Sequence, residues 1–324
     1  MKWLITGGCG FIGRALIRHL KTASPHDQIR VYDNLTVGTR DDLALEGHFS
    51  DHDETNLLSW TVGTTLIKGD ILDADSLRQA AAGADVIVHL AANTGVAPSV
   101  TDPIGDCRAN VLGTLNALEA ARHHAVGRVV FASSGAPLGV QTPPLNEEMA
   151  PHPASPYGAS KLAGEGYCSA YFHCFGVETV TLRFGNVYGE GSNKKASVVA
   201  KFIKQAMAGE TLEIYGDGSQ TRDFIYLGDL IAAVYKAATV PGIGGETFQI
   251  ATNAETTIGQ LTDKLVYALE EVAGIKANYI NGETRQGDVA RNYSDTRKAA
   301  KMLDWTCQTQ LDDGLRKTVS FFRN

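Results

Sequence analysis

The feature that most constrains the fold is a glycine-rich turn at the start of the chain. The apolar stretch Lys2–Thr6 predicts a buried strand, and it runs directly into the sequence GGCGFIG at residues 7–13. Apolar residues with helical spacing follow, and a second predicted strand over residues 28–32 ends at Asp33, 20 residues after Gly13. A strand, a glycine-rich turn, a helix, a strand and an acidic residue in this order predict a dinucleotide-binding unit.

Each part of this unit has a physical role. One glycine allows the tight turn, one lets backbone N–H groups approach a pyrophosphate, and one lets the helix pack closely on the strand. Asp33 can accept hydrogen bonds from both ribose hydroxyls, and its charge would repel a 2′-phosphate. The sequence therefore predicts NAD as the cofactor in preference to NADP.

The alternation of strands and helices continues through residue 182. Strands are predicted over residues 65–69, 85–90, 128–131 and 178–182, and helices over 73–82, over 103–123 and after 153–156. Asp73 is the expected N-cap of the helix over 73–82. Repeated βα units imply a parallel sheet covered on both faces, with ligands at the carboxyl ends of its strands. We therefore expect a Rossmann-type, doubly wound α/β domain over residues 1–182.

After Arg183 the pattern becomes irregular. Helices are predicted over residues 198–208, 229–238 and 258–273 and near the C-terminus, with short strands over 213–215, 223–226, 248–251 and 277–280. This mixture predicts a smaller, mixed α/β substrate-binding domain over residues 183–324. Segments near residues 223–251 can return to the first domain, so the predicted boundary is soft.

Composition argues against several other classes of protein. The net charge is −7 and no basic run is present, which disfavours a nucleic-acid surface. The five cysteines are scattered without a CxxC pair, as expected for free thiols in a reducing compartment. No apolar run approaches the length of a membrane span, and no leader precedes the first predicted strand. We expect a cytoplasmic protein with no membrane partner and no metal site.

The candidate catalytic residues come from the sequence YGASK at residues 157–161. Tyr157 and Lys161 are four residues apart, so on a helix both side chains leave the same face. A phenol titrates near ~10, and a neighbouring ammonium favours the phenolate. We therefore expect Lys161 to lower the pKa of Tyr157 and make it a usable acid/base. A Ser133-Ser134 pair ends a predicted buried strand 23 residues before Tyr157.

Together these motifs resemble the extended short-chain dehydrogenase/reductases, and within them the nucleotide-sugar epimerase/dehydratase branch, of the UDP-glucose 4-epimerase type. The resemblance covers nearly the whole chain. Its motifs are TGGCGFIG at residues 6–13, DNL at 33–35, GDI at 69–71, HLAA at 89–92, NVLGT at 110–114, SS at 133–134, YGASK at 157–161, RFGNVYG at 183–189, GDG at 216–218, TRDF at 221–224 and RQGD at 285–288.

The resemblance implies a role for each matched residue. Tyr157 is the acid/base at a sugar hydroxyl, Ser134 hydrogen-bonds the same hydroxyl, and Lys161 also holds the nicotinamide ribose. Asn110 lies in the helix behind the site and orders it. The implied NAD-binding residues are Gly7, Gly10, Phe11, Ile12, Gly13, Asp33, Asn34, Leu35, Asp70, Ile71, Leu90, Ala91, Ala92, Asn110, Ser133, Tyr157 and Lys161. The implied substrate-binding residues are Ser134, Asn186, Val198, Arg222, Arg285 and Asp288.

Residues after Ser134 select among the reactions of this branch. Dehydratases carry an Asp-Glu pair there and decarboxylases a Glu, whereas this chain has Gly135-Ala136. The resemblance therefore implies a 4-epimerase: Tyr157 takes the C4 hydroxyl proton, the C4 hydride passes to NAD⁺, and hydride returns to the other face of a transient 4-keto sugar. A net dehydrogenase/reductase and a non-catalytic NAD-binding protein are the alternatives.

The sugar is not fixed by these residues. Pro137-Leu138 replaces the usual Val-Tyr of the sugar loop, and Asn292 stands near the position that limits bulk at the sugar. UDP-glucose, UDP-N-acetylglucosamine and UDP-glucuronic acid all stay open, with a UDP-sugar favoured because it is the family's commonest epimerase substrate. The resemblance also implies a homodimer that pairs the helices carrying Asn110 and Tyr157 in a four-helix bundle.

Overall fold

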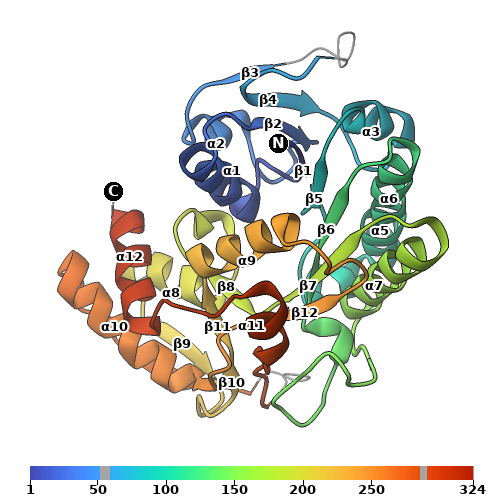
Figure 1. Ribbon diagram of the computed structural model, residues 1–324. Helices are drawn as coiled ribbons and strands as arrows, with labels where there is room; N and C mark the ends of the chain where they lie inside the picture. Colours follow the sequence, from blue (N-terminus) through green and yellow to red (C-terminus); the bar gives the residue numbers. More distant parts are fainter. Residues whose placement is uncertain (52–58, 285–289, 324) are drawn as a thin grey trace. The chain divides into compact units, whose positions relative to one another are not determined.

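A computed structural model of the chain describes residues 1–51, 59–284 and 290–323 (Figure 1). Contacts divide the chain into two compact units. The first comprises residues 1–140, 147–183 and 231–248, and the second comprises residues 141–146, 184–230 and 249–324.

The first unit is built on an eight-stranded sheet with the order β3-β4-β2-β1-β5-β6-β7-β12 (Figure 1). The pairs β1–β2, β2–β4, β3–β4, β1–β5 and β5–β6 are parallel. The chain steps from β1 to one side and later returns to its other side at β5, so the strand order reverses there. Ligands of such sheets bind beyond the carboxyl ends of the strands at this point. The strands are β1 (Lys2–Thr6), β2 (Gln28–Asp33), β3 (Phe49–Asp51), β4 (Gly63–Lys68), β5 (Val86–His89), β6 (Arg128–Ser134), β7 (Thr179–Phe184) and β12 (Thr247–Ile250).

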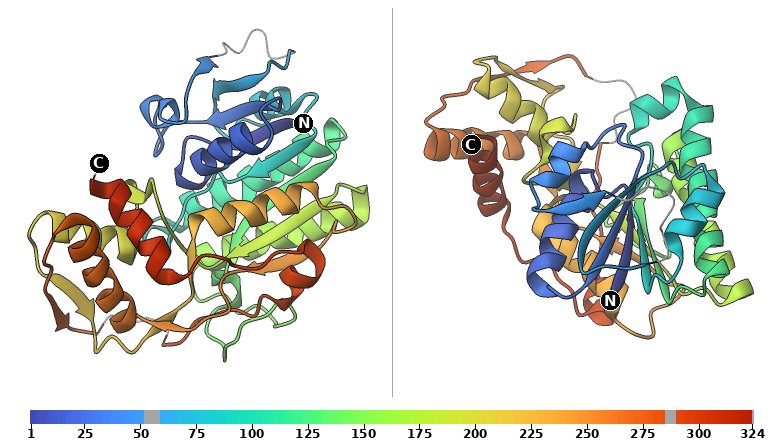
Figure 2. Two further views of the ribbon diagram at one scale, coloured as in Figure 1. Left: turned by 60° about the vertical axis from the view of Figure 1, so that its left-hand side comes forward. Right: turned by 90° about the horizontal axis from the view of Figure 1, so that it is seen from above.

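Helices cover both faces of this sheet (Figure 2). On one face lie α1 (Phe11–Ala23) and residues 231–239 of α9 (Leu227–Thr239), where the Tyr235 ring stacks on Trp3 and meets the edge of His19. On the other lie α3 (Ala74–Ala81), α6 (Gly113–His123) and α7 (Pro156–Phe175), which pack in sequence, α3 on α6 and α6 on α7. The expected doubly wound α/β architecture is confirmed.

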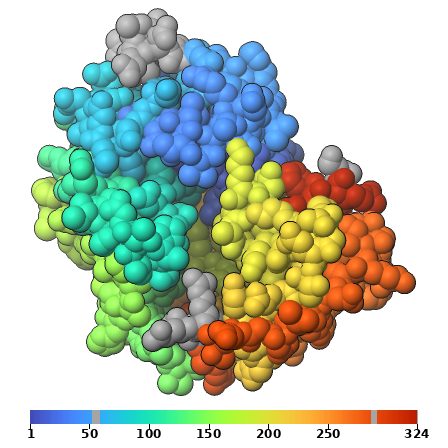
Figure 3. Space-filling model, turned by 180° about the vertical axis from the view of Figure 1, so that it is seen from behind, coloured from blue at the N-terminus to red at the C-terminus, as the bar shows by residue number. Residues whose placement is uncertain are grey.

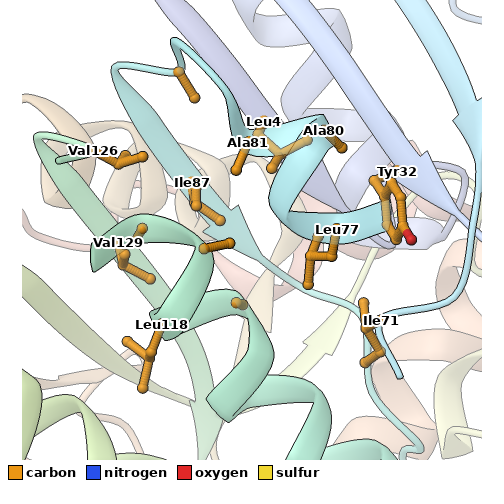
Figure 4. Packing of buried hydrophobic residues seen from close by; sticks show 14 of the residues in the cluster. Leu4, Tyr32, Ile71, Leu77, Ala80, Ala81, Ile87, Leu118, Val126 and Val129 are labelled. Atoms are coloured by element: carbon orange, nitrogen blue, oxygen red, sulfur yellow. The ribbon is translucent and has the colours of Figure 1, made fainter. Parts of the chain in front are cut away.

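A hydrophobic core fills the space between the sheet and the second of these helix layers (Figure 4). Leu4 and Ile87 contribute from strands, and Leu77 and Leu118 from α3 and α6, all fully buried. Burying one such side chain stabilises the fold by about 1.5–3 kcal/mol. This packing holds the helices against the strands. It therefore also positions the loops that follow the carboxyl ends of the strands.

Several local elements differ from the predictions. The predicted helix over 103–123 is α5 (Pro103–Cys107), a π-helical stretch η2 (Arg108–Leu112) and α6. A helix before it, α4 (Val96–Thr101), was not expected because Pro98 lies inside it. The short α2 (Arg40–Ala44), β3 and the 3₁₀ turn η3 (Ala136–Leu138) were also not predicted. Asp73 does cap α3, accepting a hydrogen bond from the Ser76 N–H.

The second unit contains three two-stranded sheets and mixed helices. Its core is formed largely where α10 and α12 pack on each other, with α8 against α10. The predicted helix over 258–273 is confirmed as α10. The elements are β8 (Asn186–Tyr188), η4 (Ser192–Lys194), α8 (Val198–Met207), β9 (Leu212–Tyr215), β10 (Thr221–Arg222), β11 (Phe224–Tyr226), β13 (Thr256–Thr257), α10 (Ile258–Ala273), β14 (Tyr279–Gly282), α11 (Arg297–Leu303) and α12 (Leu311–Arg323).

Candidate functional site

The glycine-rich turn lies at the end of β1 and admits no larger residue at two positions. Gly7 has φ +69°, and a Cβ there would lie 2.7 Å from the Ala91 nitrogen at the end of β5. A Cβ on Gly13 would lie 2.5 Å from the Gly8 Cα. The turn therefore packs closely against its own helix, as the sequence predicted, and also against the loop after β5.

The N-terminus of α1 fits the pyrophosphate of a dinucleotide. Its N-cap is Gly10, which offers no side-chain hydrogen bond to the first turn. A Cβ added to Gly10 would meet only the Gly7 carbonyl oxygen, at 3.1 Å. The helix therefore begins at Phe11 and Ile12 without a side-chain N-cap hydrogen bond. Its positive dipole end can attract a phosphate group.

Asp33 ends β2 beside this turn. Its Oδ2 accepts from the Cys9 N–H at 2.9 Å and its Oδ1 from the Leu35 N–H at 2.8 Å. Burial raises the pKa of the carboxyl, and the two N–H donors oppose that rise. Each oxygen retains acceptor capacity, so the carboxylate fits a ribose diol.

The next predicted adenosine contacts form one local cluster. Asn34 Nδ2 donates to Asp70 Oδ2 at 3.2 Å, and Asp70 Oδ1 accepts from the Leu72 N–H. The Ile71 side chain, however, lies in the core with Leu77 (Figure 4). The predicted contact of Asp70 and Ile71 with adenine stays a prediction.

A directed chain of hydrogen bonds joins the cofactor groove to the helix behind it. Thr114 Oγ1 donates to the Asn110 carbonyl at 2.6 Å, so its contact with His89 Nε2 at 3.2 Å requires His89 to donate. Burial lowers the pKa of His89 to about 3, so the ring is neutral and its Nδ1 accepts from Thr6 Oγ1 at 2.8 Å. Thr6 Oγ1 in turn accepts from the Ala91 N–H at 3.3 Å.

This series of hydrogen bonds holds the loop of half-buried Leu90, Ala91 and Ala92 in register with β1. The Leu90 N–H adds a bond to the Thr6 carbonyl at 3.2 Å. Their predicted contact with NAD stays a prediction. His89 itself was missed by sequence reasoning, although it stands first in the HLAA motif.

The catalytic candidates meet at the end of β6 and the start of α7. Ser155 caps α7 through the Gly158 N–H, which brings Tyr157 and Lys161 onto the first turns. The Ser134 hydroxyl bonds to the half-buried Tyr157 phenol. Lys161 Nζ is buried and donates to the Ala132 carbonyl at 2.9 Å, over the Phe131 ring.

Electrostatics at Tyr157 differ from the expectation. Burial raises the pKa of the phenol, the Ser134 hydrogen bond opposes this, and the charge of Asp106 raises it further. Lys161, whose ammonium donates to the Ala132 carbonyl, does not contribute to the shift of the Tyr157 pKa here. Burial also lowers the pKa of Lys161, to about 8. The predicted lowering of the Tyr157 pKa is therefore absent from this structure.

Asn110 lies in η2 and is fully engaged. Its Nδ2 is 3.0 Å from Asn93 O, Asp106 Oδ1 and Ser160 Oγ, and its Oδ1 accepts from the Asn93 N–H at 2.8 Å. Its amide donors are thus used within the protein, which agrees with a role in ordering the site, and its predicted contact with NAD stays a prediction. The Ser160 hydroxyl in turn donates a hydrogen bond to the Tyr157 carbonyl at 3.0 Å.

One further residue, Ser99, supports this arrangement without having been predicted. Ser99 Oγ on α4 accepts from the Tyr157 N–H at 3.1 Å and donates to the Val96 carbonyl. Ser133, predicted to bind NAD, is buried and donates to Glu165 Oε1 at 2.6 Å. Glu165 forms a bidentate ion pair with Arg183, so Ser133 belongs to a structural network rather than to the cofactor groove.

The loop after Ser134 carries no carboxylate at its tip. A Cβ on Gly135 would meet nothing within 4 Å. Pro137 and Leu138 form η3 and are buried, Leu138 completely. The residue that replaces the usual aromatic thus packs inward.

Apart from Ser134, the predicted substrate ligands that the structure describes belong to the second unit. Asn186 begins β8 with an exposed side chain, and its N–H donates to the Asp223 carbonyl at 2.8 Å. The half-buried Arg222 precedes Asp223, and Val198 begins α8. These substrate roles stay predictions. Arg285 and Asp288 lie outside the described residues.

Within the described ranges, no group of three or more His, Cys, Asp or Glu side chains could hold a metal ion. No helix there is both long and apolar enough to cross a membrane. All five cysteines are free.

These features define a dinucleotide-binding α/β protein with a Ser-Tyr-Lys site. The sequence model of the family described as "NAD dependent epimerase/dehydratase family" matches residues 3–251. The chain belongs to this family, and its cofactor is NAD.

Three known proteins illustrate the likeness. The UDP-glucose 4-epimerase of Mycolicibacterium smegmatis is 36% identical over 329 residues, spanning 100% of this chain and 99% of that protein. The structure of a UDP-glucose 4-epimerase from Thermotoga maritima, with UDP-glucose, has a TM-score of 0.87 at 31% identity and covers 100% of this chain and 99% of its own. The UDP-glucuronic acid 4-epimerase of Bacillus cereus, with UDP-glucuronic acid and NAD, has a TM-score of 0.85 at 29% identity, covering 99% and 98%.

Proposed function

We propose that this chain is an NAD-dependent UDP-hexose 4-epimerase with Tyr157 as its acid/base. The observation that carries the proposal is the Ser134–Tyr157 hydrogen bond beside buried Lys161, with no carboxylate among residues 135–146, which directly follow Ser134. Such a site can remove and return one hydroxyl proton. It lacks the additional acid and base that elimination of water needs.

The chain's own residues divide the work. The backbone of the glycine-rich turn and the Asp33 carboxylate hold the cofactor, and Ser134 orients the C4 hydroxyl against Tyr157. NAD⁺, when bound, supplies the acceptor that takes the C4 hydride and gives it back. Tyr157 accepts the hydroxyl proton and later returns it to the oxygen of the 4-keto sugar. Because proton and hydride both return, the reaction is an isomerisation.

The nucleotide is proposed to be UDP because the relatives named above are described as UDP-sugar epimerases. The sugar is left to experiment. Asn292 is half-buried, with its N–H on Thr221 Oγ1 at 3.3 Å, and it is smaller than a tyrosine. An N-acetyl or carboxylate-bearing sugar therefore competes with glucose as the natural substrate.

One assay tests the reaction and the substrate together. The purified chain is incubated with NAD⁺ and UDP-, dTDP- or GDP-sugars, and the products are separated by chromatography while NADH absorbance is followed. We expect one pair of UDP-sugars to interconvert without net NADH. A steady rise in NADH would instead identify a net dehydrogenase. The absence of any conversion would remove the enzyme proposal.

We also propose that the first unit binds NAD and that residues 183–324 bind the nucleotide sugar. The free cysteines support a reducing cytoplasm as the site of action.

A homodimer is proposed from the apolar surface of the first unit. Exposed apolar side chains lie on α4, α5, η2 and α7. The surface near residue 100 is drawn in teal in Figure 3. Large exposed patches of this kind mark interfaces. The patch residues are Val96, Val100, Ile104, Leu112, Tyr167 and Phe175. Light scattering should give twice the chain mass, and a monomer at micromolar concentration would contradict the dimer.

A further inference from the structure

Asp106 on α5 is a buried carboxylate with a hydrogen-bond partner for only one of its two oxygens. It is 2% exposed, and its Oδ1 accepts from Asn110 Nδ2 at 3.0 Å. Its Oδ2 is equally buried and accepts no hydrogen bond from any described residue. Burying an unpaired carboxylate oxygen is unfavourable, so such a group calls for an explanation.

Glu165 provides the contrast within the same region. It is also buried, but both of its oxygens are paired with Arg183, and Ser133 adds a third hydrogen bond. The charge of Glu165 is partly compensated by Arg183, and its effect on the Lys161 pKa is smaller than that of Asp106. The charge of Asp106 has no such local partner, and it acts on the groups that face it.

The contacts of Asp106 lead directly to the acid/base pair. Asn110 bridges Asp106 to Ser160, and Ser160 donates to the carbonyl of Tyr157. The helix that carries Asp106 packs on α7, which carries Tyr157 and Lys161. Asp106 is therefore linked to the Tyr157 carbonyl through Asn110 and Ser160, without a hydrogen bond to the reacting atoms.

The other charged groups of these packed elements are neutral, paired or exposed: His123 and His173 are exposed, and Arg128 on β6 is paired with Glu178. His89 on β5 is neutral, and Glu165 on α7 is paired with Arg183 on β7. Cys168 on α7 is held as a thiol because burial raises its pKa to about 12. Arg108 on η2 is exposed, and Glu119 on α6 is paired with Arg122. Neither η3 nor α4 carries a charged side chain.

The effect of Asp106 on the acid/base pair has a defined sign. Among the groups that raise the pKa of Lys161 against the effect of burial, Asp106 comes first, ahead of Cys168 and Glu165. The same charge raises the pKa of Tyr157. Its removal should therefore lower both pKa values together.

We propose that Asp106 is a positioning residue of the proton-transfer site, which fixes Asn110 through one oxygen and supplies the negative charge that keeps the buried Lys161 ammonium protonated. The assignment rests on the proposed epimerase function for its kinetic test. It explains why the chain retains a buried, half-satisfied carboxylate beside its catalytic helix.

The test replaces Asp106 by Asn, which preserves the acceptor for Asn110 and removes the charge. The control is Asp102→Asn, the same change on an exposed residue that caps α5, where Asn is an equally good cap. The kcat–pH profile of Asp106→Asn should move to lower pH on both limbs, by about one unit, a size typical of one nearby charge. Asp102→Asn should leave the profile in place, and Asp106→Glu should restore the parental position.

A second readout needs no turnover. The ultraviolet titration of the Tyr157 phenol, obtained by subtracting the Tyr157→Phe trace, should move to lower pH in Asp106→Asn. If Asp106→Asn does not fold, as judged by circular dichroism, Asp106→Ser takes its place. A purely structural role would reduce the height of the profile and leave its limbs in place, which would overturn the proposal. Failure of the parent to epimerise any sugar would count against the proposed function and leave the titration to decide the role of Asp106.

Discussion

Lys161 carries its charge in surroundings that disfavour it. The side chain is 3% exposed, with one hydrogen bond to Ala132 O and the face of Phe131 beside it. Burial lowers its pKa to about 8, against a usual value near ~10.4. The amine therefore loses its proton within the range in which an enzyme can be assayed.

Activity and stability should respond to this titration in opposite directions. As pH rises through about 8, loss of the Lys161 proton should reduce kcat. Because the folded pKa lies below the unfolded one, the unfolded chain binds more protons from about pH 8 to ~10, so this group makes the fold more stable as pH rises. Rate profiles and urea unfolding measure both trends. Lys161→Met should lack this contribution to stability, and a kcat that rises steadily above pH 8 would contradict the assignment.

Tyr157 can be tested by removal of one oxygen atom. Tyr157→Phe keeps the ring and removes the proton carrier, so kcat should fall about 10²–10⁴-fold with substrate binding little changed. Tyr267→Phe removes the same oxygen from a ring that is 60% exposed and should keep full activity. Steady-state kinetics on the sugar pair identified in the panel provide the measurement. Unchanged interconversion by Tyr157→Phe would remove the mechanism.

Among single residues, the sequence predicted those that belong to a recognisable motif. Asp33 and Tyr157 follow from spacing, and both lie where the pattern predicts. Ser99 and Asp106 were not predicted. They contact Tyr157 and Asn110 rather than a ligand, and residues that support a site in this way follow no fixed sequence motif. The four-residue spacing of Asp106 and Asn110 is the one signal that could have drawn attention to them.

Among the elements, η2 shows what helical periodicity does not reveal. The segment around Asn110 has the spacing of an ordinary helix, and a continuous helix was predicted. The structure inserts a π-helical stretch there, with the Asn110 carbonyl bound by Thr114 Oγ1. Such stretches are frequent at functional sites. Only the tertiary contacts of Asn110 with Asn93 and Ser160 account for it.

Two glycines on α7 make a matched test of how this helix is seated on β6. A Cβ on Gly164 would lie 2.4 Å from the Phe131 ring, whereas one on Gly166 would meet nothing within 4 Å. Gly164→Ala should destabilise the fold by about 1–3 kcal/mol through overpacking and lower activity by displacing Tyr157. Gly166→Ala should stabilise it by about 0.5–1 kcal/mol, as expected for a helix interior. Thermal unfolding compares them, and equal effects would contradict this packing.

For the whole molecule, the sequence predicted the parallel sheet because βα repeats leave few alternatives. It did not predict how the second unit pairs its short strands, because β8 with β11 and β9 with β14 are contacts between segments far apart in the chain. The 231–248 segment joins the first unit through α9 and β12. Local pattern carries no information on such long-range pairing.

The proposed homodimer can be tested at the exposed apolar side chains of α4 and α5. Val100 and Ile104 are 64% and 72% exposed, and a stable interface buries about 800 Å² on each partner. Val100→Glu and Ile104→Glu place a charge in that apolar contact and should convert the dimer to a monomer in light scattering. Val62→Glu, at a position 65% exposed outside the patch, should remain dimeric. The exposed thiol of Cys107 in the same segment should react faster in the monomeric variants, and equal rates would place the interface elsewhere.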